Sequence, residues 1–271
     1  MTLKNKLAEY SRSGKALLAA NFYNYETLKG LLQAAKKMNT PIILQLSESS
    51  LNYLGVNTAA QLARAAMKEF EVEGWVHLDH GSNIELVKRC LDAGFDSVMI
   101  DASEESFEDN VKISSAVVKL AESYGANVEA ELGYIAKLNQ HETSIFTQPV
   151  EARTFVEATG IDALAIAIGS AHGFYKKPPV LQIELLAEIH RQTTAALVLH
   201  GSSGIPDDQL KAAIRNGISK INLATETKNI FMKKLQQLLA SSDEIDLRKV
   251  FPPAIESVEN LICNKLNVIN G

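Results

Sequence analysis

The sequence predicts an α/β fold, a single (β/α)8 TIM barrel with a short C-terminal helical extension. Short apolar segments recur eight times along the 271 residues, and longer amphipathic segments alternate with them. The repeat is roughly 34 residues long, which suits one strand and one helix per unit. A doubly wound open sheet is the competing fold, but its glycine-rich first turn, G-x-G-x-x-G, does not follow the first apolar segment. We therefore expect residues 1–271 to form one barrel domain.

The expected strands are rich in Val, Ile, Leu and Ala, as parallel strands buried on both faces are. In chain order they are Ala16–Ala20, Ile42–Leu46, Trp75–Asp79, Ser97–Ile100, Asn127–Leu132, Ala163–Ile168, Ala196–Leu199 and Ile218–Leu223. The expected helices are Glu26–Met38, Ala59–Glu69, Ile84–Ala93, Asn110–Tyr124, Pro149–Thr159, Gln182–Thr193, Asp207–Asn216 and Glu226–Leu239. The tail, Asp243–Gly271, is expected to hold a break at Pro252-Pro253 and another short helix.

Several expected helices are preceded by residues that commonly cap helix N-termini. Such candidates stand before the second, third and seventh helices, as Asn57 and Thr58, Ser82 and Asn83, and Pro206 and Asp207. They mark where the loops after the strands end and the helices begin.

The composition excludes several classes of protein. Apolar residues make up 46% of the chain, enough for a large core, and the net charge of −5 gives no indication of a nucleic-acid partner or an anionic membrane surface. No apolar segment is long enough to cross a bilayer, and the N-terminal residues lack the apolar stretch of a signal peptide. Cys90 and Cys263 have no metal-type spacing and are expected to be reduced thiols. We expect a cytoplasmic protein with no nucleic-acid or membrane partner.

Polar residues stand at the ends of the expected strands, where the chemistry of a barrel is found. Burying such groups without partners costs about 1–3 kcal/mol each, so packing alone does not explain them. Together they predict a charged, hydrated pocket at one end of the barrel. They are Asn21, Ser47, Asp79, His80, Asp101, Glu129, Glu131, His172, His200 and the segment from Asn222 to Thr225.

Three of the six histidines follow three different strands. His80, His172 and His200 come just after the third, sixth and seventh expected strands. Three neutral imidazoles that meet at one point and leave a fourth position open are a ligand set of catalytic zinc. The remaining histidines are expected to be structural, one hydrogen-bonded in the core and two at the surface: His77, His141 and His190.

Asp79 and two loops of small residues complete the predicted site. Asp79 either orients an imidazole, caps a helix or acts as a general acid/base beside the metal, and the last role is favoured. The segment from Gly201 to Gly204 follows the seventh strand, and the segment from Asn222 to Thr225 follows the eighth. Backbone N–H groups of these two loops, together with a helix N-terminus, often bind phosphate in barrels.

These segments closely resemble one family, the class II fructose/tagatose-bisphosphate aldolases. The matching stretches are His77-Leu-Asp79-His80-Gly81, Ser97-Val-Met-Ile-Asp101-Ala-Ser103, Val128-Glu129-Ala-Glu131-Leu-Gly133, Ala167-Ile-Gly169-Ser-Ala-His172-Gly173, Leu199-His200-Gly201-Ser-Ser203-Gly204-Ile205-Pro206 and Lys220-Ile-Asn222-Leu-Ala224-Thr225-Glu226. A weaker match is Asp246-Leu-Arg248-Lys249, which is similar to the family's Asp-Pro-Arg-Lys segment. The resemblance follows the family's order and covers nearly the whole chain.

The resemblance implies a zinc-dependent lyase of carbohydrate metabolism. It would reversibly cleave a ketose 1,6-bisphosphate, of tagatose or fructose type, to dihydroxyacetone phosphate and an aldehyde such as glyceraldehyde 3-phosphate. His80, His172 and His200 would bind zinc, which polarises the substrate ketone, and Asp79 would be the acid/base at the C4 hydroxyl. Two acidic residues match either an alternative, buried zinc position or groups behind the ligands: Asp101 and Glu131.

The resemblance also implies residues that contact the phosphorylated sugar. The phosphate of the dihydroxyacetone half would be bound by Gly173, Gly201, Ser203, Asn222 and Thr225. A monovalent cation, Na⁺ or K⁺, would lie nearby on backbone carbonyls. Ser47 and Arg248 match positions that contact substrate phosphate, Arg248 across a dimer interface. A homodimer or homotetramer is therefore expected.

Three departures from the family pattern bear on the substrate. The segment after Gly133 lacks the family's glycine-rich loop, and Glu142 is its candidate substitute for the loop glutamate. Ala224 is typical of the tagatose-bisphosphate subgroup, and Leu247 replaces a proline. Two alternatives stay open: a non-catalytic zinc-binding subunit of an aldolase complex, and an aldolase for a non-standard ketose phosphate. A Schiff-base aldolase is weaker, because it needs a lysine at a strand end and the nearest, Lys220, begins the phosphate-loop motif.

Overall fold

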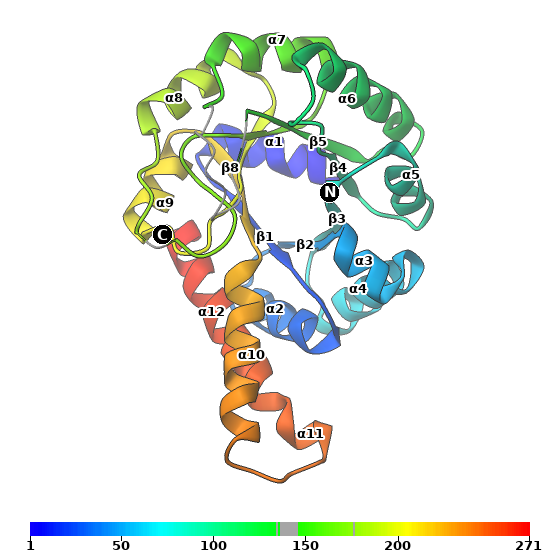
Figure 1. The fold of residues 1–271 in the computed structure, drawn as a ribbon, viewed down its shortest axis with the longest axis vertical. Helices are drawn as coiled ribbons and strands as arrows, with labels where there is room; N and C mark the ends of the chain where they lie inside the picture. Colours follow the sequence, from blue (N-terminus) through cyan, green and yellow to red (C-terminus); the bar gives the residue numbers. More distant parts are fainter. Residues whose placement is uncertain (134, 136–145, 176) are drawn as a thin grey trace.

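Eight parallel strands close into a barrel in the order in which they occur along the chain (Figure 1). The computed structural model describes residues 1–133, 135, 146–175 and 177–271. Each strand pairs with the next, and β8 pairs with β1, so the predicted barrel is confirmed. The strands are β1 (Leu17–Asn21), β2 (Ile42–Ser47), β3 (Gly74–Gly81), β4 (Ser97–Ile100), β5 (Asn127–Leu132), β6 (Ala163–Ile166), β7 (Ala196–Leu199) and β8 (Ile218–Leu223).

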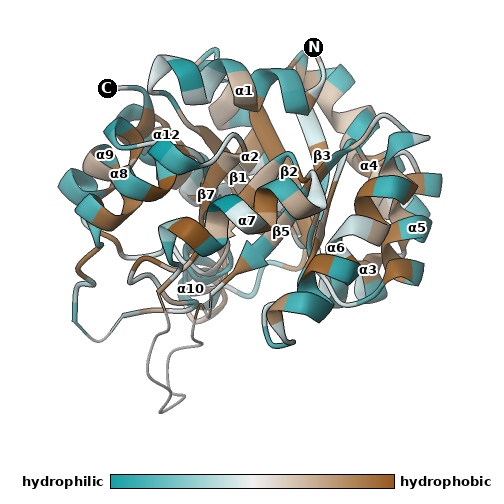
Figure 2. Cartoon of the chain, turned by 90° about the horizontal axis from the view of Figure 1, so that it is seen from above, coloured by the Kyte–Doolittle hydropathy of each residue, from teal (hydrophilic) through white to brown (hydrophobic). Residues whose placement is uncertain are grey.

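Helices surround the strands. Figure 2 shows hydrophobic strands at the centre and a surrounding layer of helices whose outer sides carry hydrophilic residues. The eight helices expected from the sequence are α2 (Tyr25–Lys37), α4 (Val56–Phe70), α5 (Ile84–Asp92), α6 (Phe107–Glu122), α7 (Pro149–Thr159), α8 (Ile183–Gln192), α9 (Asp207–Arg215) and α10 (Thr225–Leu239). The structure adds α1 (Leu3–Ser13) and α3 (Glu48–Leu54) to them, and the tail forms α11 (Leu247–Val250) and α12 (Pro252–Asn270). Among the described residues, no helix combines the length and apolar character that crossing a membrane requires.

One of the expected helix caps is confirmed and another is wrong. The Asn83 side chain accepts a hydrogen bond from the backbone N–H of Leu86 at 2.9 Å, which caps α5. In contrast, α4 begins at Val56, so the expected caps Asn57 and Thr58 lie inside its first turn. Gly55 takes the cap position instead, because the turn from α3 into α4 needs its positive φ of +82°.

The N-terminal helix α1 closes one end of the barrel (Figure 1). Leu3 and Leu7, one turn apart, are buried against residues of the barrel interior that include Trp75. The Trp75 indole N–H also donates to the backbone oxygen of Met1 at 3.1 Å. This end of the barrel is therefore closed by apolar packing, so a catalytic site can form only at the opposite end. The i, i+4 spacing of the two leucines is the sequence signal for this helix.

Helices α10 and α12 extend beyond the barrel as an arm, with α11 at its tip (Figure 1). We call this segment the arm. The 19-residue helix α12 begins with Pro252 and Pro253, so the proline pair starts a helix and does not interrupt one. It packs against α2, where a Cβ on Gly30 would come within 2.8 Å of the Val258 Cβ. Gly30 therefore permits the close approach of the two helices.

The barrel interior changes from apolar to charged along its axis. Beside α1 it is filled by apolar side chains, among them the small residues Ala163 and Ala165 of β6 and Ala196 of β7. Small residues on these strands leave volume for long side chains from β5 and β8. Glu129 and Lys220, both 0% exposed, lie nearer the open end, where Glu129 contacts His200. The charged layer lies directly under the open end of the barrel.

Candidate functional site

Asp79 and His80 are neighbours in β3, yet both line the cavity at the open end of the barrel. Consecutive side chains of a regular strand point to opposite faces. Here the pairing of β3 with β4 shifts register between Leu78 and Gly81, and His80 has a φ of +51°, in the left-handed region. Such an irregularity re-aims a side chain. Gly81 is required beside it, because a Cβ there would come within 2.6 Å of the Met99 backbone oxygen.

The loops after β6 and β7, which carry His172 and His200, are held together. Gly201 has a φ of +67°, and a Cβ on it would collide with the Ala171 backbone, so the two loops touch backbone to backbone. The Tyr175 hydroxyl accepts a hydrogen bond from the Ala171 N–H at 2.7 Å and donates to the Gly201 oxygen at 2.8 Å. Burial raises the pKa of Tyr175 to about 12, so the hydroxyl keeps its proton at neutral pH.

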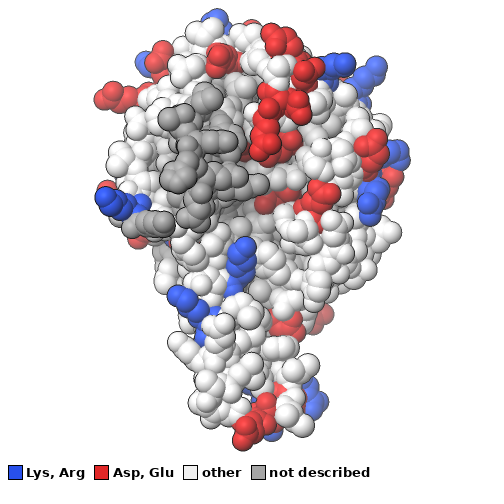
Figure 3. Space-filling model, in the orientation of Figure 1, with Lys and Arg blue, Asp and Glu red and all other residues white. Residues whose placement is uncertain are grey.

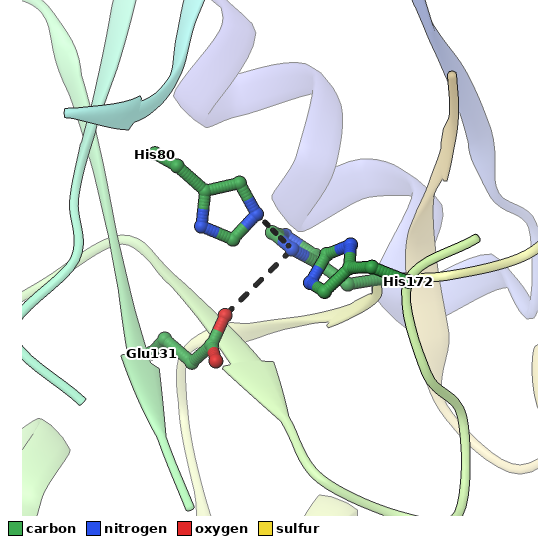
Figure 4. Close-up of side chains that lie close together, drawn as sticks. His80, Glu131 and His172 are labelled. Carbon is green, nitrogen blue, oxygen red and sulfur yellow. Dashed lines mark hydrogen bonds and ion pairs between the residues drawn. The ribbon is translucent and has the colours of Figure 1, made fainter. Parts of the chain in front are cut away.

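The three histidines predicted to bind a metal converge, and Glu131 lies beside them. Figure 4 shows the side chains of His80, Glu131 and His172 directed towards one another, and one ligand atom from each of these and His200 lies within 4.8 Å of all the others. The His200 Nδ1 atom is 3.0 Å from His80 Nε2 and 3.7 Å from Glu131 Oε2. Nitrogen ligands of a tetrahedral zinc ion lie about 3.3 Å apart, so small movements suffice to accommodate one. The buried Glu131 Oε2 atom has no hydrogen-bond partner among the described residues, which suits an oxygen whose partner is a cation.

The groups of this cluster have strongly shifted pKa values. Burial alone would lower the pKa of His80, but the Asp79 and Asp101 carboxylates raise it to about 9. Its Nδ1 atom lies 2.7 Å from Asp101 Oδ2, and this pairing holds the pKa of Asp101 well below its usual value despite burial. Burial and the Asp101 charge raise the pKa of Glu131 to about 8. Burial and the charge of His80 hold the pKa of His200 well below its usual value. A divalent ion must therefore displace protons from this cluster.

Asp79 is a buried carboxylate held by two amide donors. Its Oδ2 atom accepts from Asn21 Nδ2 at 2.9 Å and its Oδ1 atom from Asn222 Nδ2 at 3.2 Å. Gln45 donates to Asn21 Oδ1 at 2.6 Å, which fixes the orientation of that amide. Burial would raise the pKa of Asp79, but nearby positive charges, His80 first among them, and the Asn21 donor lower it below its usual value. Asp79 is thus ionised at neutral pH and able to accept a proton.

A buried ion pair lies next to His200. Glu129 Oε2 is 2.7 Å from Lys220 Nζ, and Glu129 Oε1 is 2.9 Å from His200 Nε2. On the other side, Lys220 Nζ is 3.3 Å from His77 Nε2, and the His77 Nδ1 atom is 2.8 Å from the Ser97 hydroxyl. His77 is therefore a hydrogen-bonded core residue, as predicted. The Lys220 ammonium points into the barrel interior and is 0% exposed.

The residues predicted to bind phosphate line one cavity together with Asp79, His80 and His172: Gly173, Gly201, Ser203, Asn222 and Thr225. Thr225 is the first residue of α10, so the positive end of that helix lies at the cavity. The Ser203 hydroxyl accepts from the Glu226 N–H at 3.2 Å, which ties the loop after β7 to the start of α10. The buried Asn222 Oδ1 atom has no hydrogen-bond partner among the described residues.

A wider cavity of about 730 Å³ lies outside the metal cluster, and Ser47 is part of its lining. Acidic residues, including Glu104 and Glu105, line one part of it, and Figure 3 shows acidic side chains gathered on one side of this face. Among its described lining residues, Lys228 is the one lysine or arginine. Lys228 lies one helical turn after Thr225 on α10, so both belong to the same face of the helix.

Other residues singled out in the sequence lie apart from this cluster. Arg248 is on α11 at the tip of the arm (Figure 1), where its 90% exposed side chain pairs with Asp246 at 3.0 Å. In the described part of the chain, no hydrogen bond or ion pair joins Arg248 to the barrel mouth. Glu142 and His141 are outside the described residues. His190 is half-buried and not at the surface as predicted, because its ring packs against the backbone of Gly217.

Three residues of the site were missed in the sequence. Gln45 is a polar residue inside an apolar strand, and this placement was the available signal. Tyr175 lies in a loop and Lys228 on an exposed helix face, where no pattern separates them from ordinary surface residues.

Comparison with known proteins gives matches over the whole chain. A family model described as fructose-bisphosphate aldolase class-II matches residues 1–271. The fructose-bisphosphate aldolase of Geobacillus stearothermophilus is 39% identical over 273 residues, which cover 98% of this chain and 95% of that protein. A probable fructose-bisphosphate aldolase of Bacillus subtilis is also 39% identical, over 98% and 96% of the two chains. Among solved structures, the YdjI aldolase of Escherichia coli K12 superposes with a TM-score of 0.89 at 28% identity, over 98% and 96% of the chains. A putative fructose-1,6-biphosphate aldolase of Coccidioides immitis gives 0.91 at 25% identity, over 99% and 96%.

Proposed function

The chain belongs to the class II fructose-bisphosphate aldolases, a family of metal-dependent lyases. From this premise we propose that it reversibly cleaves a ketose 1,6-bisphosphate to dihydroxyacetone phosphate and glyceraldehyde 3-phosphate. The observation that carries the proposal is the convergence of three histidines beside Asp79 at the barrel mouth. The Geobacillus and Bacillus relatives are named for fructose bisphosphate, so we propose the fructose-type substrate ahead of its C4 epimer, tagatose 1,6-bisphosphate.

Zinc is the proposed metal, with His80, His172 and His200 as its ligands. Three imidazole nitrogens with one open position match the preference of catalytic zinc. Glu131 and Asp101 support this site in two ways: the Asp101 carboxylate orients His80, and Glu131 Oε2, 3.7 Å from His200 Nδ1, offers an alternative oxygen ligand. When bound, the ion supplies a Lewis acid that polarises the ketone of the substrate.

Asp79 is the proposed acid/base. In cleavage its ionised carboxylate takes the proton of the C4 hydroxyl as the C3–C4 bond breaks, and the electron pair of that bond passes to the ketone half. In condensation the protonated carboxyl returns this proton to the aldehyde oxygen. The amide donors of Asn21 and Asn222 hold the carboxylate in one orientation, which keeps it aimed into the cavity.

The substrate phosphates are proposed to bind on both sides of this centre. Gly173, Gly201, Ser203, Asn222 and Thr225 hold the phosphate of the dihydroxyacetone half, where backbone N–H groups and the N-terminus of α10 favour an anion. A monovalent cation, Na⁺ or K⁺, is proposed beside this phosphate. Ser47 lines the wider cavity and is proposed to contact the distal phosphate.

The protein is proposed to act as a homodimer, alone or within a homotetramer, that forms through the arm. Four large apolar side chains gather there with exposures between 50% and 90%: Met232, Leu239, Ile245 and Leu247. An exposed apolar cluster of this kind marks an interaction surface. Arg248 lies on the same segment, and in a dimer the partner's Arg248 is proposed to reach the distal phosphate beside Ser47. The free thiols of Cys90 and Cys263 support the proposed cytoplasmic location.

The test is an aldol-cleavage assay with fructose 1,6-bisphosphate and tagatose 1,6-bisphosphate. We expect chelation to abolish activity, added zinc or cobalt to restore it, and Asp79→Ala to bind zinc without turnover. Activity that survives thorough metal removal contradicts the proposal. Zinc-loaded protein without turnover on a panel of ketose phosphates supports a non-catalytic subunit instead. Borohydride is expected to trap no substrate on Lys220, because that side chain is 0% exposed.

A further inference from the structure

We propose that the buried Glu129–Lys220 pair is a positioning device for the metal site. It holds His200 in the tautomer that presents an unprotonated Nδ1 atom to the ion. This inference rests on the proposed zinc site, and it assigns a role to two residues that are not among its ligands. Both residues are 0% exposed, so neither reaches the substrate cavity directly.

The two ring nitrogens of His200 face different surroundings. Nδ1 faces the metal cluster, 3.0 Å from His80 Nε2. Nε2 faces the barrel interior, 2.9 Å from Glu129 Oε1 and 3.0 Å from Asn222 Nδ2. A neutral imidazole carries its proton on only one nitrogen, and a metal binds the other. The His200 ring ligates through Nδ1 only if Nε2 holds the proton.

The two neighbours of Nε2 favour opposite tautomers. The Asn222 amide nitrogen is a donor, so on its own it favours an unprotonated Nε2 atom in His200. The imidazole proton would then lie on Nδ1, and that proton would exclude the metal. An ionised Glu129 carboxylate only accepts, so it favours the proton on Nε2. The Lys220 ammonium, 2.7 Å from the other Glu129 oxygen, stabilises that ionised form inside the barrel. The ion pair therefore favours the His200 tautomer whose Nδ1 atom is available to the metal.

A purely structural role for the same pair predicts a different result. If the pair only stabilises the fold, changes to it lower the stability but leave the zinc affinity of the folded protein unchanged. His77 provides a matched control, because its Nε2 atom lies 3.3 Å from Lys220 Nζ and 3.8 Å from Glu129 Oε2, and it is equally buried. A change at His77 disturbs the same polar layer without touching the proposed ligand.

The experiment measures zinc affinity by competition with a chromogenic chelator of known affinity, which needs no turnover. Glu129→Gln removes the charge and keeps the shape, and the double variant Glu129→Met with Lys220→Met removes the acceptor beside His200 together with the ammonium that pairs with it. We expect both to bind zinc about 10–100-fold more weakly than the parent, the usual loss when a group that orients a ligand is changed. His77→Gln is expected to stay within about threefold of the parent. Excess zinc should restore much of the aldolase activity of both Glu129 variants.

The outcomes separate this inference from the function on which it rests. A parent protein that binds no zinc contradicts the proposed metal site itself. A parent that binds zinc, with a folded double variant within about threefold of it, overturns the positioning role and leaves the metal site intact. An equal loss of affinity in His77→Gln also overturns it, because the effect would then belong to the whole buried layer.

Discussion

Zinc binding at neutral pH is expected to release about two protons from the protein. The pKa of His80 is raised to about 9 and that of Glu131 to about 8. At pH 7 these values make His80 about 99% and Glu131 about 90% protonated. Ligation needs a bare His80 nitrogen, and the charge of the ion favours an ionised Glu131 beside it. His200 contributes no proton, because its pKa is held well below its usual value.

The same two pKa values set the direction of the pH dependence. Each released proton makes the apparent zinc affinity rise about tenfold per pH unit, so two protons give about a hundredfold rise between pH 6 and pH 7. The rise in apparent zinc affinity ends above pH 9, where Glu131 is ionised and His80 has lost its extra proton. Both pKa values also lie above the ordinary values for these side chains, so at these two groups the metal-free folded state binds more protons than the unfolded chain. His77 and His200, whose pKa values are lowered, act in the opposite direction below about pH 6.5. Stability without added zinc is therefore expected to fall as the pH rises from about 7 to 9.

Calorimetric titration with zinc in buffers of different ionisation enthalpy counts the released protons directly. The measured heat is plotted against the buffer enthalpy at pH 7, and the slope is the number of protons. Glu131→Gln is expected to lower the slope from about two to about one, while the His80 proton remains. A slope near zero in the parent refutes the charge assignment of the cluster. A slope of two that Glu131→Gln does not change places the second proton elsewhere.

Lys228→Met is expected to raise KM for the bisphosphate about tenfold with little change in kcat, because it removes the one lysine or arginine among the described residues that line the wider cavity. An unchanged KM in steady-state assays contradicts this. Tyr175→Phe removes two hydrogen bonds of a half-buried hydroxyl and should lower the free energy of unfolding by about 1–3 kcal/mol in denaturant titrations. Gly30→Val is expected to cost about 1–3 kcal/mol in the same assay, because its side chain would overlap Val258 of α12. An unchanged midpoint for Gly30→Val would mean that α2 and α12 are not closely packed.

The strands and the convergence of the three histidines were predictable because position in the sequence determines position in a barrel. β4, β5, β7 and β8 have the bounds expected from their apolar patterns. His172 and His200 follow β6 and β7, and the ends of parallel strands meet at one end of a closed barrel. The sequence therefore predicts that these side chains lie close together, even though it gives no distances.

The features of the site that could not be predicted from the sequence depend on tertiary contacts. The shift in pairing beside His80 arises between β3 and β4, so no local pattern reveals that His80 and Asp79 face the same way. The charge states of Glu131 and His80 follow from burial and from Asp101, which only the folded chain brings near. The position of Arg248 at the tip of the arm likewise follows from the length of α10, which was expected, and from how α12 returns to the barrel, which was not.

The packing of α12 on α2 has a consequence for how the barrel assembles during translation. Gly30 and Val258 lie near opposite ends of the chain, so a ribosome makes them roughly 10–45 s apart at ordinary rates of synthesis. Throughout that interval the side of α2 that carries Gly30 lacks its partner α12, and for most of it β1 also lacks its neighbour β8, which ends at Leu223. The barrel therefore stays open until β8 is made, and apolar surface of α2 stays uncovered until the last helix follows, so chaperones can bind the nascent chain in the meantime.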